Sequence, residues 1–278
     1  EPDGSAKPVD ISTGASMYGS KFSLPSAVYV EDDGTVLVGQ AAMNSRKRKP
    51  QNFRMEFKRD LGQEIPVMLG NRSFRPEELY TEMFRHMKGR AEQSAGEKIE
   101  KAYLTYPASF GKSKKEKVLS AARAAGLFEV ELVDEPTAAA MSYCQAGLIR
   151  DGQTLLIYDF GGGTFDVSLI RYENGAYRLL TEPDGLEHCG GIDIDRMIYQ
   201  DMMAQIGPEL LDMVNANRLN RMRLESQLAE MAVKAKHHLS SAKKYEEDIQ
   251  VGFDLVPYQL TREQLNSKAA QLVGQTIA

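Results

Sequence analysis

Apolar residues form two kinds of pattern along the first part of the chain, and each pattern predicts a different kind of element. Short apolar runs predict strands at 26–31 and 36–39, with Asp33-Gly34 as the hairpin turn between them. A period of three to four residues predicts a helix from Pro76 to about Ala95. The apolar face of this helix consists of Leu79, Met83, Phe84 and Met87. The segment before about Ser20 is rich in Gly, Ser, Asp and Pro, so we expect turns there.

The next segment predicts the order strand, helix, strand, helix. "KAYLTYP" reads as a strand, and "SKKEKVLSAARAAG" reads as a helix that Ser113 and Glu116 cap as an S-x-x-E box and Gly126 ends. "LFEVELVD" predicts the second strand. Pro136 suits the first turn of the helix that follows, "PTAAAMSYCQAG", which Gly147 closes.

A fresh series of elements begins near residue 150. Strands are expected at 154–159, 165–172 and 176–181, with the last two joined by Asn174-Gly175. Two helical stretches follow "DGLEHCGGIDID", the second of them long, then a strand over 249–255 and a last helix capped by Thr261 with Gln264. Mixed strands and helices that restart in this way predict an α/β protein of two lobes, 1–149 and 150–278.

Composition narrows the function classes. With a net charge of -5 and one dense basic run, residues 46–49, the chain offers no basic stripe with aromatic residues for nucleic acid. The two cysteines lie far apart in sequence, which favours a reducing cytoplasm over a framework of disulfides. Neither the cysteines nor the four histidines have the spacing of metal ligands. The sequence has no long apolar stretch and no signal peptide, so we expect neither a membrane-spanning nor a secreted chain.

The stretch "LLIYDFGGGTFDVSLI", residues 155–170, carries the clearest chemistry. It lacks the lysine and the helix of a Walker loop, and it opens a strand where a dinucleotide-binding fingerprint opens a helix. It therefore predicts a hairpin whose glycines, Gly161 to Gly163, let backbone amides approach a polyphosphate. Asp159 would face that anion only with Mg²⁺ between them, and Thr164 adds a hydroxyl. A tight hairpin with Asp159 as a local acceptor stays open as the alternative.

Several segments taken together resemble a known family. "LTYPASF", "VDEPTAAAMSY", "DFGGGTFDVSLI" and "CGGIDID" occur in the order and at the spacings of the nucleotide-binding domain of DnaK-like, seventy-kilodalton heat-shock chaperones, within the actin and sugar-kinase superfamily. The resemblance covers the chain from about Ser26 to the end. It implies an actin-like fold of two lobes, each based on a ribonuclease-H-like sheet, with Mg-ATP in the cleft between them. Since the chain begins without Met and ends inside a helix-like pattern, we expect a fragment of such a domain.

The resemblance also implies roles for individual residues. Lys58, Glu135, Asp159 and Thr164 would serve catalysis, with Asp159 and Glu135 holding Mg²⁺ through water, and K⁺ as a further cation. The nucleotide would be bound by the residues Gly161, Gly162, Gly163, Gly190, Gly191, Lys236 and Ser240, with Asp193 and Asp195 beside the glycine pair. Pro107 and Lys115 would couple the nucleotide state to an interdomain linker, where an arginine is usual in place of Lys115.

Departures from the family limit these expectations. Val233 and His237 stand where a glutamate and, in many members, an arginine contact adenosine, and Ser109 replaces a common tyrosine. The N-terminal phosphate-loop hairpin and the late adenosine loop have no counterpart here. The implied function is ATP binding and hydrolysis that control the binding of unfolded or extended peptides by another domain, with a J-domain co-chaperone and a nucleotide-exchange factor as partners. A non-catalytic nucleotide-sensing module and a sugar kinase are the alternatives.

Overall fold

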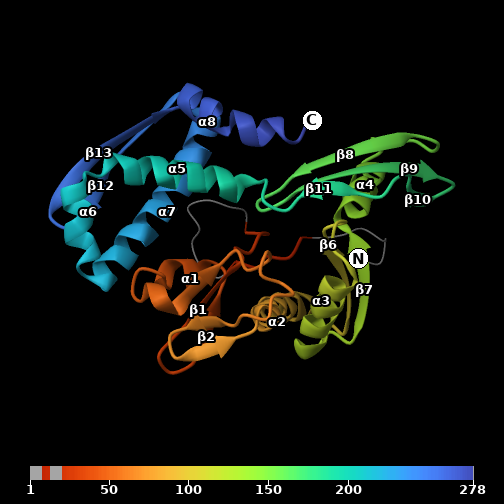
Figure 1. Cartoon of the computed structure of the whole chain (residues 1–278). Coiled ribbons are helices and arrows are strands. Elements are labelled where there is room, and N and C mark those ends of the chain that lie inside the picture. Colours follow the sequence, from red (N-terminus) through yellow and green to blue (C-terminus); the bar gives the residue numbers. More distant parts are fainter. Residues whose placement is uncertain (1–7, 13–20, 278) are drawn as a thin grey trace. The chain divides into compact units, whose positions relative to one another are not determined.

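The structure, a computed structural model, describes residues 8–12 and 21–277 and is a mixed α/β protein (Figure 1). The helices are α1 (Gln40–Ser45), α2 (Pro76–Ala95), α3 (Lys112–Ala124), α4 (Glu135–Gln145), α5 (Gly191–Gln205), α6 (Pro208–Asn215), α7 (Arg218–Ser241) and α8 (Arg262–Gly274), with a short 3-10 turn at Pro50–Asn52. The strands are β1 (Ala27–Val30), β2 (Val36–Val38), β3 (Phe53–Met55), β4 (Val67–Leu69), β5 (Arg72–Phe74), β6 (Lys101–Tyr106), β7 (Glu129–Asp134), β8 (Thr154–Phe160), β9 (Phe165–Glu173), β10 (Ala176–Leu179), β11 (Asp184–Leu186), β12 (Lys244–Val251) and β13 (Asp254–Thr261).

The chain forms two compact units that interleave in sequence. Unit 1 comprises Glu1–Ile157 and Ser168–Pro183, and unit 2 comprises Tyr158–Val167 and Asp184–Ala278. The hairpin of β8 and β9 thus contributes residues to both units. The division into lobes at residue 150 stays a prediction. Of the described helices, none is long and apolar enough to cross a membrane.

Unit 1 contains three hydrophobic clusters, and α2 contributes to two of them. In the first, β1 pairs antiparallel with both β2 and β3, and its Val28 and Val30 pack with Phe57 and with Leu79 of α2. In the second, α3 packs on one face of the parallel pair β6–β7. The alternation of half-buried and exposed residues along β6 and β7 follows from this one-sided cover. Tyr80 of α2 packs against both clusters.

The core of unit 2 lies between α5, α7 and the antiparallel hairpin β12–β13 (Figure 1). Leu228, Ala232, Ala235 and Leu239 form a buried stripe on α7 with three- and four-residue spacing, as the sequence predicts. A smaller cluster joins the β8–β9 hairpin to α5 and α8 through Phe165, Cys189 and Leu272. This cluster fixes the loop end of the β8–β9 hairpin within unit 2.

Most predicted elements are confirmed, including the turn residues. The helix over Pro76–Ala95 has the predicted bounds. Asn174 and Gly175 both have positive φ, 53° and 77°, as a tight hairpin turn between right-twisted strands requires. Thr261 caps α8 and forms the predicted capping box with Gln264. Gly126 follows α3 with φ 86°.

Three predictions about elements are wrong. Ser113 does not cap α3, because the helix begins at Lys112 with Gly111 as its N-cap and no side-chain cap. The apolar alternation over 249–255 is not one strand but two strand ends and the turn between them, since Gly252 turns the chain with φ 65°. Three helices, not two, lie between residue 190 and β12, because Gly207-Pro208 starts the short helix α6.

Candidate functional site

The glycine-rich segment is a hairpin loop, as predicted. The Gly161 N–H donates to the Thr164 carbonyl at 2.9 Å, and at the other end the Tyr172 N–H donates to the Gln153 carbonyl at 3.0 Å. Gly161 is as far from Gln153 along the chain as Thr164 is from Tyr172. Both bonds therefore belong to the same antiparallel register of β8 and β9. That register sets Asp159 opposite Asp166, on either side of the loop.

The N-terminus of α5 holds this loop from one side. The N–H groups of Gly191 and Ile192 donate to the carbonyls of Gly161 and Gly162 at 3.0 and 2.8 Å. These amides are among those that a helix leaves unpaired at its start. In a planar trans peptide the N–H points opposite to the carbonyl, so the amides of Gly162 and Gly163 point away from α5. The loop therefore presents backbone amides on the face that α5 does not cover, which suits an anion.

Gly190 is required by the closeness of this contact. A Cβ atom at position 190 would lie 2.8 Å from the Gly161 carbonyl oxygen and 2.9 Å from the carbonyl carbon and oxygen of Gly162. All three are backbone atoms, which cannot move aside as a flexible side chain could. The Gly190 N–H donates to Asp193 Oδ2 at 3.0 Å, so Asp193 caps α5. The structure thus brings together both predicted glycine motifs and Asp193.

Lys236 ties α7 to the same region of α5. Its Nζ donates to the Gly191 carbonyl at 3.0 Å and to Asp195 Oδ2 at 2.8 Å. Burial raises the pKa of Asp195, and the opposing effect of Lys236 does not cancel that rise. Ser240, one turn further along α7, is exposed and donates its hydroxyl to the His237 carbonyl at 2.6 Å. The predicted roles of Lys236 and Ser240 in binding adenosine stay predictions.

Unit 1 contains a second group of predicted residues. Lys58 lies in a turn after β3, and its Nζ donates to Glu135 Oε1 at 2.9 Å. Glu135 is the first residue of α4, where Asp134 caps the helix by accepting from the Thr137 N–H at 2.8 Å. A carboxylate is favourable at this helix end, and Lys58 gives it a second partner. Lys58 and Glu135 are far apart in sequence, and the structure brings them together.

The two predicted coupling residues also lie near one another. Pro107 is buried directly after β6. Lys115 of α3 donates from Nζ to the Tyr106 hydroxyl at 3.2 Å, and the same Nζ lies 4.2 Å from the centre of the Tyr106 ring. Lys115 therefore reaches the strand end next to Pro107 through a cation–π contact.

Asp166 is a candidate site residue that the sequence analysis missed. It is 3% exposed, and neither carboxylate oxygen has a hydrogen-bond partner among the described residues. Gly185 pairs with it on β11, and a Cβ there would meet Asp166 Oδ1 at 3.3 Å and the Phe165 carbonyl oxygen at 2.3 Å. The signal in the sequence was an aspartate on each side of the glycine loop, at mirror positions of one hairpin.

The facing pair of Asp159 and Asp166 fits a bound cation. Like charges opposite one another destabilise a hairpin, and a carboxylate buried without a partner is unfavourable. A cation with oxygen ligands would relieve both effects. Within residues 8–12 and 21–277, no three His, Cys, Asp or Glu side chains form a ready-made metal site. The remaining ligands of a cation here would then be water or phosphate oxygens.

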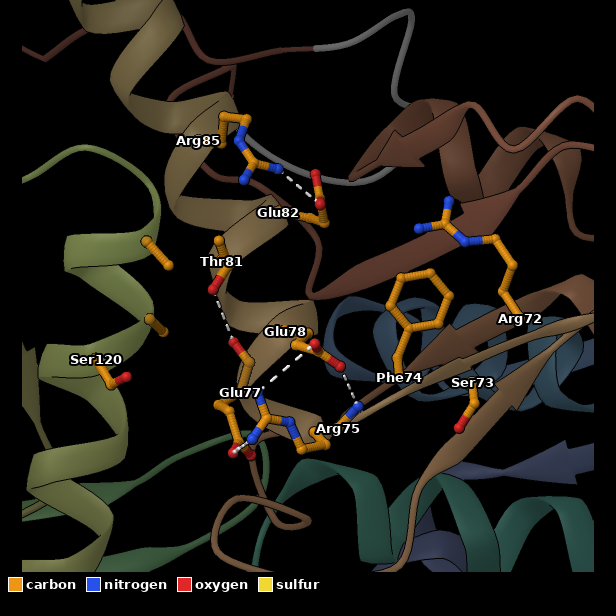
Figure 2. A pocket seen from close by; sticks show the side chains of 12 residues that line it. Arg72, Ser73, Phe74, Arg75, Glu77, Glu78, Thr81, Glu82, Arg85 and Ser120 are labelled. Atoms are coloured by element: carbon orange, nitrogen blue, oxygen red, sulfur yellow. Dashed lines mark hydrogen bonds and ion pairs between the residues drawn. The ribbon is translucent and has the colours of Figure 1, made fainter.

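A separate polar cavity of about 330 Å³ lies between β5, α2 and α3 (Figure 2). Its lining includes Arg72, Arg75, Glu77, Glu78 and Ser120, and none of the predicted site residues. Glu77 is 7% exposed and pairs with Lys117 Nζ at 2.8 Å, which joins α2 to α3. The charges lining this cavity are largely neutralised by one another.

Over most of its length the chain is similar to a known protein family. The family profile described as Hsp70 protein matches residues 63–278. The chain belongs to the Hsp70 family. The match to Hsp70 spans β4 through α8, and so includes both glycine motifs, Glu135 and Lys236.

Curated Hsp70 relatives show the same similarity. The chaperone protein DnaK of Mycoplasmopsis agalactiae is 34% identical over 226 residues, which are 81% of this chain and 36% of the relative. DnaK of Mycoplasmopsis synoviae is 34% identical over 222 residues, 80% of this chain and 36% of the relative. DnaK of Methanothermobacter thermautotrophicus is 32% identical over 231 residues, 82% of this chain and 37% of the relative. The chain thus spans little more than a third of the length of these relatives.

Proposed function

We propose that this chain is the nucleotide-binding part of an Hsp70 chaperone and that it binds and hydrolyses ATP. The observation that carries the proposal is the glycine hairpin of unit 2. The Gly162 amide points away from α5, and the hairpin register sets Asp159 opposite Asp166, whose buried carboxylate has no hydrogen-bond partner among the described residues. Membership of the Hsp70 family supports the same function. The finer fold that we propose is actin-like, with two lobes based on ribonuclease-H-like sheets.

In this proposal the hairpin binds the phosphates and positions the cation. Gly161 to Gly163 would lie against the phosphates, where the Gly162 amide would donate to a phosphate oxygen, and the Thr164 hydroxyl would add a donor near the terminal phosphate. Asp159 and Asp166 would hold Mg²⁺ with its retained waters, and the facing carboxylates could also accept K⁺. Bound Mg²⁺ would supply charge neutralisation for the phosphates. Gly190 would support the loop, since its contact with Gly161 and Gly162 leaves no room for a side chain, and Gly191 would support it by donating its N–H to the Gly161 carbonyl.

Lys58 and Glu135 would act at the terminal phosphate. Phosphoryl transfer depends mainly on positioning and on stabilising developing negative charge, so the Lys58 ammonium would offset charge on the transferred group. Glu135 holds Lys58 at 2.9 Å and would orient the attacking water or a water bound to the cation. In-line attack of that water forms the new P–O bond while the bond to ADP breaks.

The proposal also covers how adenosine is recognised and which partners the whole protein would have. Lys236 and Ser240 would hold adenosine, and Val233 and His237 would make that recognition weaker than in relatives with a glutamate and an arginine there. Pro107 and Lys115 would transmit the nucleotide state to a linker. The whole protein would work in the cytoplasm on unfolded or extended peptides, with a J-domain co-chaperone and a nucleotide-exchange factor.

Calorimetric titration with Mg-ADP and Mg-ATP, followed by single-turnover hydrolysis, tests this proposal. We expect binding of both nucleotides, weaker binding after chelation of Mg²⁺, and release of phosphate. Absence of nucleotide binding would overturn the proposal. Binding without turnover would favour a nucleotide-sensing module, and faster loss of ATP on addition of glycerol or hexose would favour a sugar kinase.

A further inference from the structure

The turn that carries Lys58 is anchored at both ends in the core of unit 1. Phe57 at its start is 2% exposed and belongs to the cluster around β1. Leu61 at its end is 1% exposed and belongs to the cluster around α3. The Asp60 N–H donates to the Phe57 carbonyl at 3.1 Å, and the Leu61 N–H donates to the Lys58 carbonyl at 3.4 Å. Lys58 is thus an exposed residue on a tightly held turn.

The backbone entering this turn is strained. Glu56 has φ 62°, in the left-handed region that residues other than glycine rarely adopt. Its N–H donates to the Ser26 carbonyl at 3.1 Å. On the same side of the turn, Arg54 of β3 forms an ion pair with Asp60. Such a conformation persists only where the surrounding contacts hold it in place.

Tyr80 of α2 is the side chain that links these two anchors. Its ring meets Phe57 edge-on, with centroids 5.6 Å apart and an interplanar angle of 79°, and it lies 5.9 Å from the ring of Phe84. It packs against the clusters of both Phe57 and Leu61. Burial raises the pKa of Tyr80, and the negative charge of Glu135 adds to that rise, so the phenol lies within electrostatic reach of Glu135.

We propose that Tyr80 is a positioning residue for nucleotide hydrolysis, which holds the Phe57–Leu61 turn so that Lys58 meets Glu135. This inference rests on the proposed function for its catalytic part. The aromatic ring does the positioning, since the contacts with Phe57 and Phe84 are ring contacts. Loss of the ring should loosen the turn and slow hydrolysis. Loss of the hydroxyl alone should do neither.

Hydrogen exchange of the nucleotide-free protein tests the structural step. In Tyr80→Leu, exchange of the Asp60 and Leu61 amides should rise about tenfold relative to amides of β1, because these two bonds close the turn. Tyr80→Phe should stay within about twofold of the wild type. Val214→Ala in α6 is the matched control, a core truncation in unit 2 at a residue that is 7% exposed, and it should not raise exchange selectively in the turn. Equal exchange in the wild type and Tyr80→Leu would overturn the inference.

Two measurements, the rate of single-turnover ATP hydrolysis and the Kd for Mg-ADP, test whether Tyr80 contributes to hydrolysis. Tyr80→Leu should lower the hydrolysis rate about tenfold while the Kd for Mg-ADP changes by less than about twofold, because Lys58 acts at the terminal phosphate. Tyr80→Phe should restore the wild-type rate. A loosened turn with an unchanged rate would refute the positioning role. A wild type that does not hydrolyse ATP would overturn the proposed function, and the exchange experiment would still decide whether Tyr80 holds the turn.

Discussion

At the scale of single residues, Gly190 gives the most direct test of the close contact between α5 and the glycine loop. A methyl group there would lie 2.8 to 2.9 Å from the backbone of Gly161 and Gly162, so Gly190→Ala should push the two loops apart. We expect the free energy of unfolding to fall by about 1–3 kcal/mol and nucleotide affinity to fall about tenfold or more. Urea unfolding and calorimetry measure the two effects. Gly274→Ala, where nothing lies within 4 Å of the added carbon, should change neither; equal effects of both variants would contradict the explanation.

A second prediction at this scale concerns Glu77 and pH. Burial opposes ionisation of Glu77, but the hydrogen bond and charge of Lys117, with a smaller effect of Arg75, hold its pKa below the ordinary value of 4.5. A lowered pKa in the folded state means that the ionised group stabilises the fold above pH 4.5, and that this stabilisation is lost as the pH falls through the folded-state pKa.

Urea unfolding of the wild type and of Glu77→Gln across pH 3–7 tests this linkage. The wild type should be more stable by about 1–3 kcal/mol at pH 7, and the difference should shrink below pH 4.5. Glu116→Gln, whose side chain is 65% exposed, should leave the stability curve unchanged. A difference between wild type and Glu77→Gln that is constant with pH would show that the lost stability does not come from the charge.

At the scale of elements, the capping of α8 gives a direct prediction. The Thr261 hydroxyl accepts from the Gln264 N–H at 3.2 Å, and the Gln264 side chain accepts from the Thr261 N–H at 2.8 Å. Thr261→Ala should lower the free energy of unfolding by about 1 kcal/mol, measured in urea. Ser267→Ala, on the exposed middle of the same helix, should be neutral or slightly stabilising. Equal loss from both variants would argue against a specific cap.

Elements were predictable from the sequence where local chemistry decides them. The Asn174-Gly175 turn, the Thr261 cap and the stop at Gly126 each depend on residues adjacent in sequence. The prediction for Ser113 was wrong because an S-x-x-E pattern is compatible with more than one helix start. The helix α3 begins at Lys112, two residues before the start that a Ser113 cap would give. The prediction of a single strand over 249–255 was wrong because the apolar alternation continues through the tip of a hairpin, where Phe253 is fully exposed.

At the scale of the whole molecule, the family could be predicted from four motifs, whereas the contacts among site residues could not. Lys58 and Glu135 meet through tertiary structure, and no pattern in the local sequence of either residue predicts their contact. Asp166 was missed because an aspartate within a strand is ambiguous until its burial is known. The bonds from α5 to the glycine loop likewise join segments that only the fold brings together.

The central claim is that these residues form the site of an ATPase, and single-turnover hydrolysis of Mg-ATP by the wild type and Lys58→Ala tests it most directly. Lys58→Ala should lower the hydrolysis rate at least about 100-fold, because it removes a charge that offsets the transferred phosphate, with the Kd for Mg-ADP within about twofold. Lys112→Ala, whose side chain is 92% exposed, is the matched control and should match the wild type. Wild-type hydrolysis that persists at the same rate in Lys58→Ala would contradict the account.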